Sequence, residues 1–277
     1  MKKIILILII LSTALVSNAQ RGWEVGGWLG TSHYFGDLNP NFELNSLGAA
    51  GGGFMRYNFN NRLAFKLGLN YLNISGSDKF SDNTFQKIRN LSFRSNVLDG
   101  VGQFEFNFLP YNHGSVKEFY TPYVFAGLNV FHFNPQANYD SNGDGNYDTW
   151  ADLNPLGTEG QFKGEEYYLT QGGLVYGLGV KISFNFEWSL ELEFSSRYLY
   201  TDFLDDVSGK YPEFDNLAAL HGSLAVELSD RSGEVSPNAV GIPGHQRGNA
   251  EDKDFYAMMG ISVVYYFGSI RCPNVSY

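Results

Sequence analysis

The segment Arg62–Ile74, RLAFKLGLNYLNI, decides the fold of this chain. Its residues alternate between apolar and polar, and a period of two places successive side chains on opposite faces of a β-strand. The segment therefore predicts a strand with one apolar face and one polar face. The apolar face carries Leu63, Phe65, Leu67, Leu69 and Tyr71, and the polar face carries Arg62, Lys66 and Asn70.

Seven further stretches carry a strand pattern. In residues 91–108 the first half has the opposite phase to the second, which indicates a β-bulge near Val97. Residues 120–133 are apolar on both faces, so the alternation leaves their phase open. The seven stretches are residues 23–33, 47–59, 91–108, 120–133, 171–184, 188–198 and 255–267.

The connections between these strands alternate in length. Asn60-Asn61, Leu109–Phe119 and Asn185–Glu187 are short or medium links, and the connections after the first, third, fifth and seventh strands are longer. Outer-membrane barrels show this asymmetry, with short periplasmic turns, long external loops and an even strand number. The pattern predicts an all-β fold: an eight-stranded antiparallel transmembrane β-barrel in a Gram-negative outer membrane, with both termini periplasmic. A soluble meandering barrel shares the alternation and is the alternative.

The N-terminus has the features of a secretory signal peptide over residues 1–19. Lys2 and Lys3 precede the apolar run Ile4–Leu11, and small residues up to Ala19 suit cleavage there. Residues 20–277 are then one barrel domain with a short periplasmic C-terminal tail. No other run is long and apolar enough for a membrane-spanning helix.

Composition narrows the function classes. The formal net charge is −10, and removal of Lys2 and Lys3 makes the mature chain more acidic, which argues against a nucleic-acid partner. The 16% aromatic content and the 32 glycines suit a barrel, because aromatic residues favour the membrane boundary and glycine relieves crowding between strands. Cys272 is the only cysteine, so no intramolecular disulfide forms. A bond from Cys272 to a partner protein stays open, beside the reading as a bystander.

A barrel in hydrocarbon must close, because an open edge leaves backbone groups unpaired. Eight strands enclose a lumen that side chains fill. The inward ionisable residues carry both signs in similar numbers, which predicts a paired plug rather than an open pore. They are Glu24, Arg56, Arg62, Lys66, Asp99, Glu105, Lys181, Glu191, Glu193 and Arg197.

No residue is assigned a catalytic, cofactor-binding or metal-binding role. Glu191 and Glu193 lie two apart on one strand face and would suit acid–base chemistry. The favoured interpretation is a lumen salt-bridge lattice with Arg197, Arg62 and Lys66, because buried charges need partners whatever the function. The histidines lack the spacing of a metal-ligand set, and polar loop or interface positions are expected for them. They are His33, His113, His132, His221 and His245.

Two loop segments have a recognisable pattern. Asp140–Asp148 imitates the start of a calcium loop, but Ala151 stands at position 12 and Asp152 comes one residue late, so an ordinary external loop is favoured. Residues 216–228 suit a short amphipathic helix, interpreted as a lid over the barrel mouth.

Several segments together resemble the PorG-type outer-membrane barrels of the type IX secretion system of Bacteroidota. The more particular ones are Tyr34–Pro40 and Leu153–Gln161, whereas the strand segment Thr121–Gly127 is common among small barrels. The match is extended by Leu228–Ser232, Arg247–Asn249, Asp254–Tyr256 and Arg271–Pro273.

The resemblance implies a non-enzymatic component of a protein export machine, without a cofactor. Its partners would be the outer-membrane bilayer and a periplasmic ring made by a lipoprotein and its partner subunit. The candidates for the ring contact are the three short turns and the tail Gly268–Tyr277. The alternatives are a small OmpA/OmpW-like barrel for structural support or small-solute passage, and a barrel enzyme acting on lipids.

Overall fold

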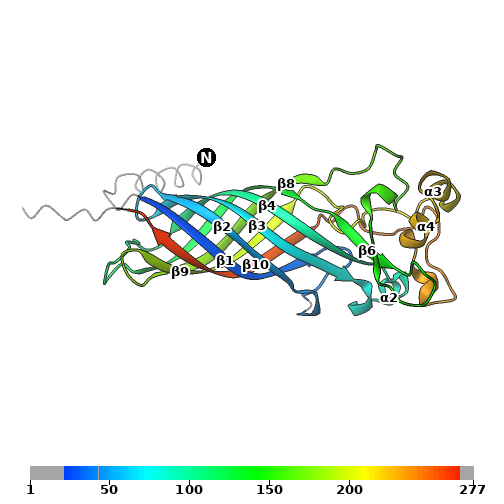
Figure 1. Ribbon diagram of the computed structural model, residues 1–277, viewed down its shortest axis with the longest axis horizontal. Coiled ribbons are helices and arrows are strands. Elements are labelled where there is room, and N and C mark those ends of the chain that lie inside the picture. Colours follow the sequence, from blue (N-terminus) through cyan, green and yellow to red (C-terminus); the bar gives the residue numbers. More distant parts are fainter. Residues whose placement is uncertain (1–21, 43, 269–277) are drawn as a thin grey trace, which may run out of the picture.

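The computed structural model describes residues 22–42 and 44–268 and shows a closed antiparallel β-barrel (Figure 1). Each barrel strand pairs with its neighbours along the chain, and the last pairs with the first. The predicted eight-stranded barrel is thus confirmed. Its strands are β1 (Gly22–Phe35), β2 (Gly48–Asn58), β3 (Leu63–Ser77), β4 (Ser92–Asn107), β5 (Tyr120–His132), β8 (Thr170–Ser183), β9 (Trp188–Leu199) and β10 (Phe255–Tyr266).

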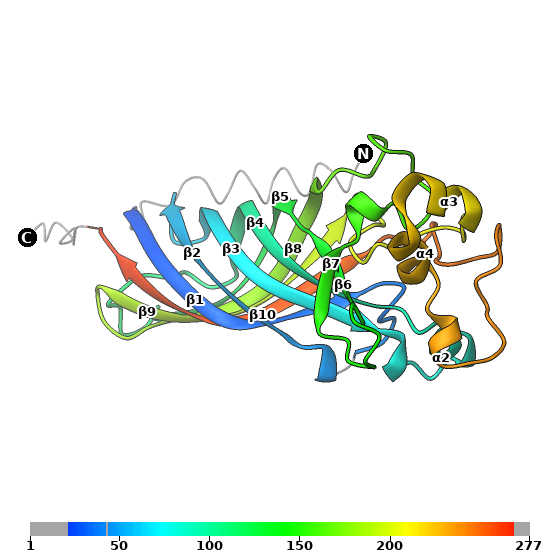
Figure 2. The ribbon, with the colours of Figure 1, turned by 45° about the vertical axis from the view of Figure 1, so that its right-hand side comes forward.

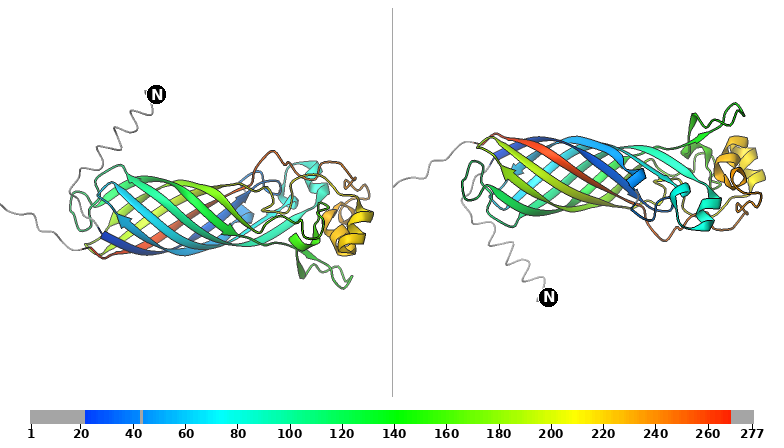
Figure 3. Two further views of the ribbon diagram at one scale, coloured as in Figure 1. Left: turned by 90° about the horizontal axis from the view of Figure 1, so that it is seen from above. Right: turned by 90° about the horizontal axis from the view of Figure 1, so that it is seen from below.

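The two faces of the barrel wall differ as the alternation predicts. On β3, Leu67 and Leu69 are exposed on the outside, whereas Lys66 and Asn70 are buried on the inside. The strands run obliquely around the barrel, as the two views of Figure 3 show. Among the described residues, no helix has the length and apolar character needed to cross a bilayer.

The predicted bulge near Val97 is wrong. The β3–β4 register runs from Leu63 opposite Phe106 to Ser77 opposite Ser92 without an extra residue. The apolar–polar alternation reverses in the sequence because the inward face of the strand changes from apolar residues to polar ones along its length. Asp99 lies among polar groups, whereas Val97 belongs to an apolar cluster nearer the end of the barrel.

The phase of β5 is settled by its inward aromatic residues. Tyr123 and Phe125 are buried inside the barrel, and Val124 is exposed outside. The Lys181 ammonium lies 4.4 Å from the centroid of the Tyr123 ring, and the Lys66 ammonium lies 5.5 Å from that of Phe125. Because an aromatic face attracts a cation, these rings belong in a charged lumen. This explains why both faces of the strand are apolar.

The four longer connections fold over one end of the barrel, and we call them the cap (residues 36–47, 78–91, 133–169 and 200–254; Figure 2). The main apolar core lies here, with Phe93, Phe133, Leu204 and Leu228 fully buried. The opposite end, with the short turns, we call the short-turn end. The cap contains α2 (Thr84–Arg89), β6 (Pro135–Tyr139), β7 (Thr149–Asp152), α3 (Phe214–His221), α4 (Ser223–Ser229) and the 3-10 turns η1 (Leu44–Ser46), η2 (Asp78–Phe80), η3 (Asn154–Leu156) and η4 (Ser232–Glu234).

The single helix expected over residues 216–228 is wrong in detail. The chain forms two helices, α3 and α4, which are separated by Gly222 at φ 91°. Glycine adopts this backbone conformation without steric cost because it has no Cβ atom, so Gly222 can end one helix and begin the next. Leu217 and Leu228 turn their side chains into the cap, which agrees with a lid over this end.

The signal peptide predicted for residues 1–19 and Cys272 in the C-terminal tail lie outside the described residues.

Candidate functional site

Arg56 on β2 is the centre of the lumen and is completely buried. Its Nη1 atom donates to Glu24 at 2.6 Å and to Glu191 at 2.5 Å, and its Nη2 atom donates to the second Glu191 oxygen at 2.7 Å. The Nε atom lies 2.8 Å from Glu105. One guanidinium thus joins carboxylates from three other strands, which its planar fork of donors permits.

Two lysines extend this network. Lys181 lies 2.6 Å from Glu105, and Lys66 lies 2.5 Å from Glu193 and 3.6 Å from Glu105. The Tyr123 hydroxyl donates to Glu193 at 2.7 Å. Each carboxylate is therefore held by a cation from another strand, as buried charges require.

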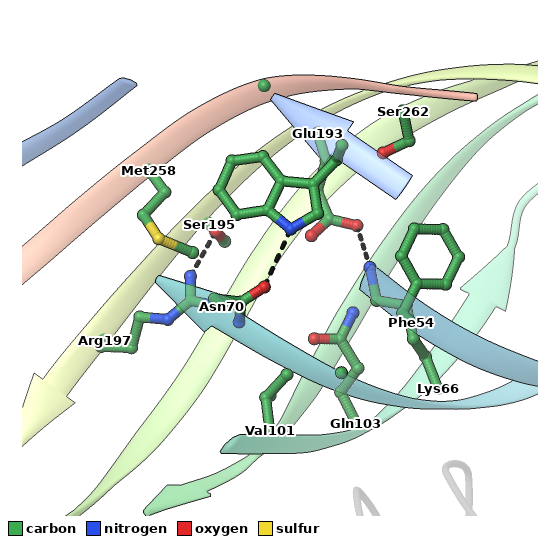
Figure 4. A pocket seen from close by; sticks show the side chains of 13 residues that line it. Phe54, Lys66, Asn70, Val101, Gln103, Glu193, Ser195, Arg197, Met258 and Ser262 are labelled. Atoms are coloured by element: carbon green, nitrogen blue, oxygen red, sulfur yellow. Dashed lines mark hydrogen bonds and ion pairs between the residues drawn. The ribbon is translucent and has the colours of Figure 1, made fainter. Parts of the chain in front are cut away.

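Nearer the cap, Asp99 accepts hydrogen bonds from Asn129 at 2.7 Å and Asn70 at 3.0 Å, and lies 3.3 Å from Arg197. The Trp28 indole donates to Asn70 at 2.8 Å. Figure 4 shows Asn70 and Arg197, together with Lys66 and Glu193, around a cavity of about 20 Å³. That space holds one or two water molecules, so this part of the lumen is filled by side chains.

The short-turn end is closed by the turn between β4 and β5. His113 from this turn lies 3.0 Å from Glu24, and its ring stacks on that of Tyr266 with centroids 4.5 Å apart. The Asn58 amide donates to the same Glu24 oxygen at 2.5 Å. His113 thus lies in a loop, as expected, but its side chain is buried and forms part of the plug.

The predicted lattice is right in kind and wrong in most of its pairs. Glu193 does meet Lys66, but Glu191 is held by Arg56 and Arg197 meets Asp99. Arg62 lies in the β2–β3 turn and donates to the Phe108 carbonyl, so its placement in the lumen is wrong. Both glutamates are occupied by cations, an arrangement that favours a structural role over acid–base chemistry.

A second charged network lies in the cap, around the buried Arg247. Its Nη1 atom donates to Glu159 at 3.0 Å and to the Asp206 carbonyl at 2.5 Å, and its Nε atom donates to the Ser229 carbonyl at 3.1 Å. Glu159 also accepts from the backbone N–H of Ser208 at 2.7 Å. Arg247 therefore ties the connection 133–169 to two distant parts of its own connection, 200–254.

Arg89 on α2 joins the same network to the first loop. It pairs with Asp78 at 2.7 Å and donates to the carbonyls of Arg247 and Asp37. The Asp37 carboxylate in turn accepts from the Asn249 N–H at 2.8 Å. The segments that carry the family resemblance, Tyr34–Pro40, Leu153–Gln161, Leu228–Ser232 and Arg247–Asn249, thus meet in one place.

An acidic group lies beneath this network, at the mouth of the barrel. Asp205 and Asp254 both contact the Tyr34 hydroxyl, at 2.5 and 3.0 Å. Burial raises the pKa of both carboxyls well above the usual range, and their mutual repulsion raises that of Asp254 further. Burial also raises the pKa of Asp202 and of Asp206 to about 6. Protonated carboxyls are therefore favoured in the folded cap.

This group makes cap stability depend on pH. A carboxyl whose folded pKa is raised from 3.8 to about 6, as for Asp206, contributes stability that is present below pH 4 and is lost as the pH rises through 6. One such shift corresponds to about 3 kcal/mol. We expect cap amides to exchange hydrogen more slowly at pH 5 than at pH 7.5, after correction for the intrinsic rate. Asp206→Asn should reduce this difference, and equal protection at both pH values would contradict the assignment.

The calcium-like loop uses its first carboxylate internally. Asp140 accepts backbone N–H groups from Gly143 at 2.8 Å and Gly145 at 2.7 Å, a turn arrangement in which a side chain binds its own loop. Among the described residues, no group of three or more His, Cys, Asp or Glu is placed to hold a metal ion. His221 instead contacts the carbonyls of Pro155 and Gln161.

The sequence pattern did not identify the charged residues that hold the cap together. Asp37, Glu159, Asp206 and Arg247 lie in irregular loops, where no periodicity marks which side chains turn inward. The sequence offered one indication: the segments that resemble PorG-type barrels lie mostly in these loops. The resemblance does not say which residues in them contact one another.

Comparison with known proteins gave one family and several solved barrels. The family model described as "Domain of unknown function (DUF6089)" matches residues 2–154. The barrel domain of Pseudomonas aeruginosa OprF is 13% identical, with a TM-score of 0.36, and the match covers 90% of this chain and 100% of that one. Neisserial surface protein A is 10% identical, with a TM-score of 0.43 and coverages of 89% and 97%. Pseudomonas aeruginosa OprG is 11% identical, with a TM-score of 0.39 and coverages of 91% and 98%. No curated protein sequence matches.

Proposed function

The chain belongs to the DUF6089 family, and from its architecture and the resemblance of its loops we propose that it is a non-enzymatic outer-membrane barrel that anchors the periplasmic ring of a type IX secretion complex. The short-turn end then faces the periplasm and the cap faces outward. The observation that carries the anchoring role is the sealed lumen, because a barrel plugged by side chains offers no path for an exported protein.

The outer surface supports the membrane location. Large apolar side chains such as Leu29, Leu69 and Phe104 stand exposed around the barrel, 78%, 67% and 63% open respectively. Exposed apolar surface of this extent marks an interaction with a membrane or partner. A belt of this kind combined with a charged interior supports a lipid-embedded barrel over a soluble one.

The particular loop segments support the resemblance but supply no ring contact, because they are used to hold the cap together. Among the candidate surfaces, we propose the β4–β5 turn as the contact with a periplasmic partner. Its backbone is fixed by Tyr111 N–H on the Asn61 carbonyl and by Gly114 N–H on Ser183. Val116 at its apex is 90% exposed, with Lys117 beside it.

We expect the paired change Val116→Asp and Lys117→Glu to reduce recovery of the ring lipoprotein and its partner subunit to a tenth or less. An exposed apolar residue and its neighbouring charge would both be lost from the contact. The measurement is affinity capture of the barrel from solubilised outer membranes, with the ring kept intact. Lys163→Glu, an exposed charge in the cap, is the matched control.

Capture of the native barrel without any ring subunit would refute the anchoring role. Deletion of the gene provides the cellular test, because secreted cargo should then accumulate inside the cell. Normal secretion in the deletion strain would count equally against the proposal.

The sealed lumen also predicts the outcome for small-solute passage. We expect the protein to show no conductance steps in planar bilayers, since opening a path requires breaking the ion pairs of Arg56. A steady conductance that changes in Glu191→Gln would favour a transport barrel instead.

A further inference from the structure

A cavity of about 520 Å³ lies against the outside of the barrel wall, where the strands end and the cap begins. Its floor consists of outward aromatic side chains on consecutive strands. Phe35 on β1 pairs with Phe255 on β10, and their rings stack at 4.5 Å with 9° between the planes. Phe255 in turn pairs with Tyr198 on β9, and Tyr176 on β8 continues the floor away from the cap.

The upper wall of the cavity is polar and held in place by the cap network. Asp37 accepts the Asn249 N–H at 2.8 Å, and its own carbonyl accepts from Arg89 at 3.0 Å and from Gln86 at 3.2 Å. The Asn249 side chain donates to Asp252 at 2.7 Å. The cavity is therefore built by ordered contacts on two sides rather than left between loose loops.

The rim of the cavity carries charges of both signs. The Lys253 ammonium is exposed and contacts the Ala250 carbonyl at 3.3 Å, a weak hydrogen bond for an ammonium. Exposed carboxylates of Glu251 and Asp252 precede it in the chain. A ligand that bears only negative charge meets two carboxylates here, whereas a zwitterion meets partners for both of its charges.

We propose that this cavity binds the head group of a membrane lipid that carries both an ammonium and a phosphate. The phosphate would meet Lys253, the ammonium would meet Glu251 and Asp252, and the acyl chains would run from Tyr198 over Tyr176 along the apolar barrel surface. The volume lies within the range of small-ligand sites, and an aromatic floor beneath a polar wall suits an amphiphile. The inference rests on the outer-membrane location proposed above and is independent of the role in secretion.

The test is titration of the detergent-solubilised, folded barrel with dihexanoyl-phosphatidylethanolamine, followed by native mass spectrometry. We expect this lipid to bind about tenfold more tightly than dihexanoyl-phosphatidylglycerol, and Lys253→Glu to weaken its binding by roughly tenfold through loss of a charge-assisted hydrogen bond. Lys163→Glu makes the same charge change elsewhere in the cap and should bind as the native chain does. Tyr198→Ala should weaken binding of the lipid through the floor alone.

Equal binding of the two lipids, or native affinity in Lys253→Glu, would overturn the proposal. Phosphoethanolamine without acyl chains binding as tightly as the lipid would also overturn it, because the floor would then contribute nothing. The membrane location is tested separately, in the cells that produce the protein. A chain found outside the outer-membrane fraction refutes the membrane placement. Loss of lipid discrimination in a membrane-embedded barrel refutes only the proposed binding of lipid in the cavity.

Discussion

Arg56→Met is expected to prevent stable assembly of the barrel. The substitution leaves Glu24, Glu105 and Glu191 without the guanidinium that joins them, and all three carboxylates are almost fully buried. Removing one partner of a buried ion pair costs about 3–5 kcal/mol, which is a large part of the roughly 5–15 kcal/mol that stabilises a typical domain. The measurement is urea unfolding in lipid vesicles, followed by the mobility difference between folded and heated protein on gels.

Arg62→Met provides the matched control, because Arg62 lies in a turn and contacts only the Phe108 carbonyl among the contacts described for its side chain. A triple variant, Arg56→Met with Glu105→Gln and Glu191→Gln, should recover part of the loss, since fewer buried charges are then unpaired. Equal urea midpoints for Arg56→Met and Arg62→Met would contradict the central place given to Arg56.

Arg247→Met is expected to loosen the cap while the barrel stays folded. It removes the donors that hold Glu159, the Asp206 carbonyl and the Ser229 carbonyl together. Proteolysis within residues 153–169 and 200–254 should become at least about tenfold faster, because a cost above 1.4 kcal/mol raises the open population by that factor. Digestion of the folded barrel with a protease that does not cleave after basic residues, followed by mass spectrometry, measures it.

Lys210→Met is the control for Arg247→Met, since Lys210 is an exposed cap residue with no ion pair among the described residues. Cleavage of both variants at the native rate would show that Arg247 does not hold the loops together. Loss of the whole barrel in Arg247→Met would show that cap and barrel unfold as one unit.

The barrel strands could be predicted because one physical rule governs them along their whole length. Each strand needs an outer face that suits lipid and an inner face that suits paired charges. The position of Leu69 or Lys66 in the alternation is therefore enough to assign it to the outer or the inner face. The rule fails where the inside changes: Val97 and Phe93 point inward but pack against the cap, and the apparent break in phase suggested a bulge that does not exist.

Contacts across the lumen could not be read from alternation. Arg56 on β2 and Glu191 on β9 are separated in the sheet by β1 and β10, and they meet because the barrel closes with a particular stagger. The pattern fixes which face a side chain occupies and not its height in the lumen. Glu191 was therefore grouped with Arg197, which instead lies beside Asp99.

The cap was least predictable because its contacts join irregular loops. Asp206 adopts a positive φ of 65° while its side chain meets Thr158 and Tyr167 from another loop. Such an arrangement depends on how several loops pack against one another, and no short-range sequence pattern predicts it. The only indication in the sequence was that the segments with the family resemblance lie mostly in these loops.

The most direct test of the barrel as a lipid-embedded, charge-filled cylinder is the folding of residues 20–277 with and without detergent, measured by circular dichroism and size-exclusion chromatography. We expect a β-sheet spectrum and a single narrow peak in detergent or lipid. In plain buffer we expect aggregation, because the exposed leucines and phenylalanines of the outer wall then meet water. A folded, monodisperse chain in plain buffer would contradict the membrane placement and with it the proposed anchoring role.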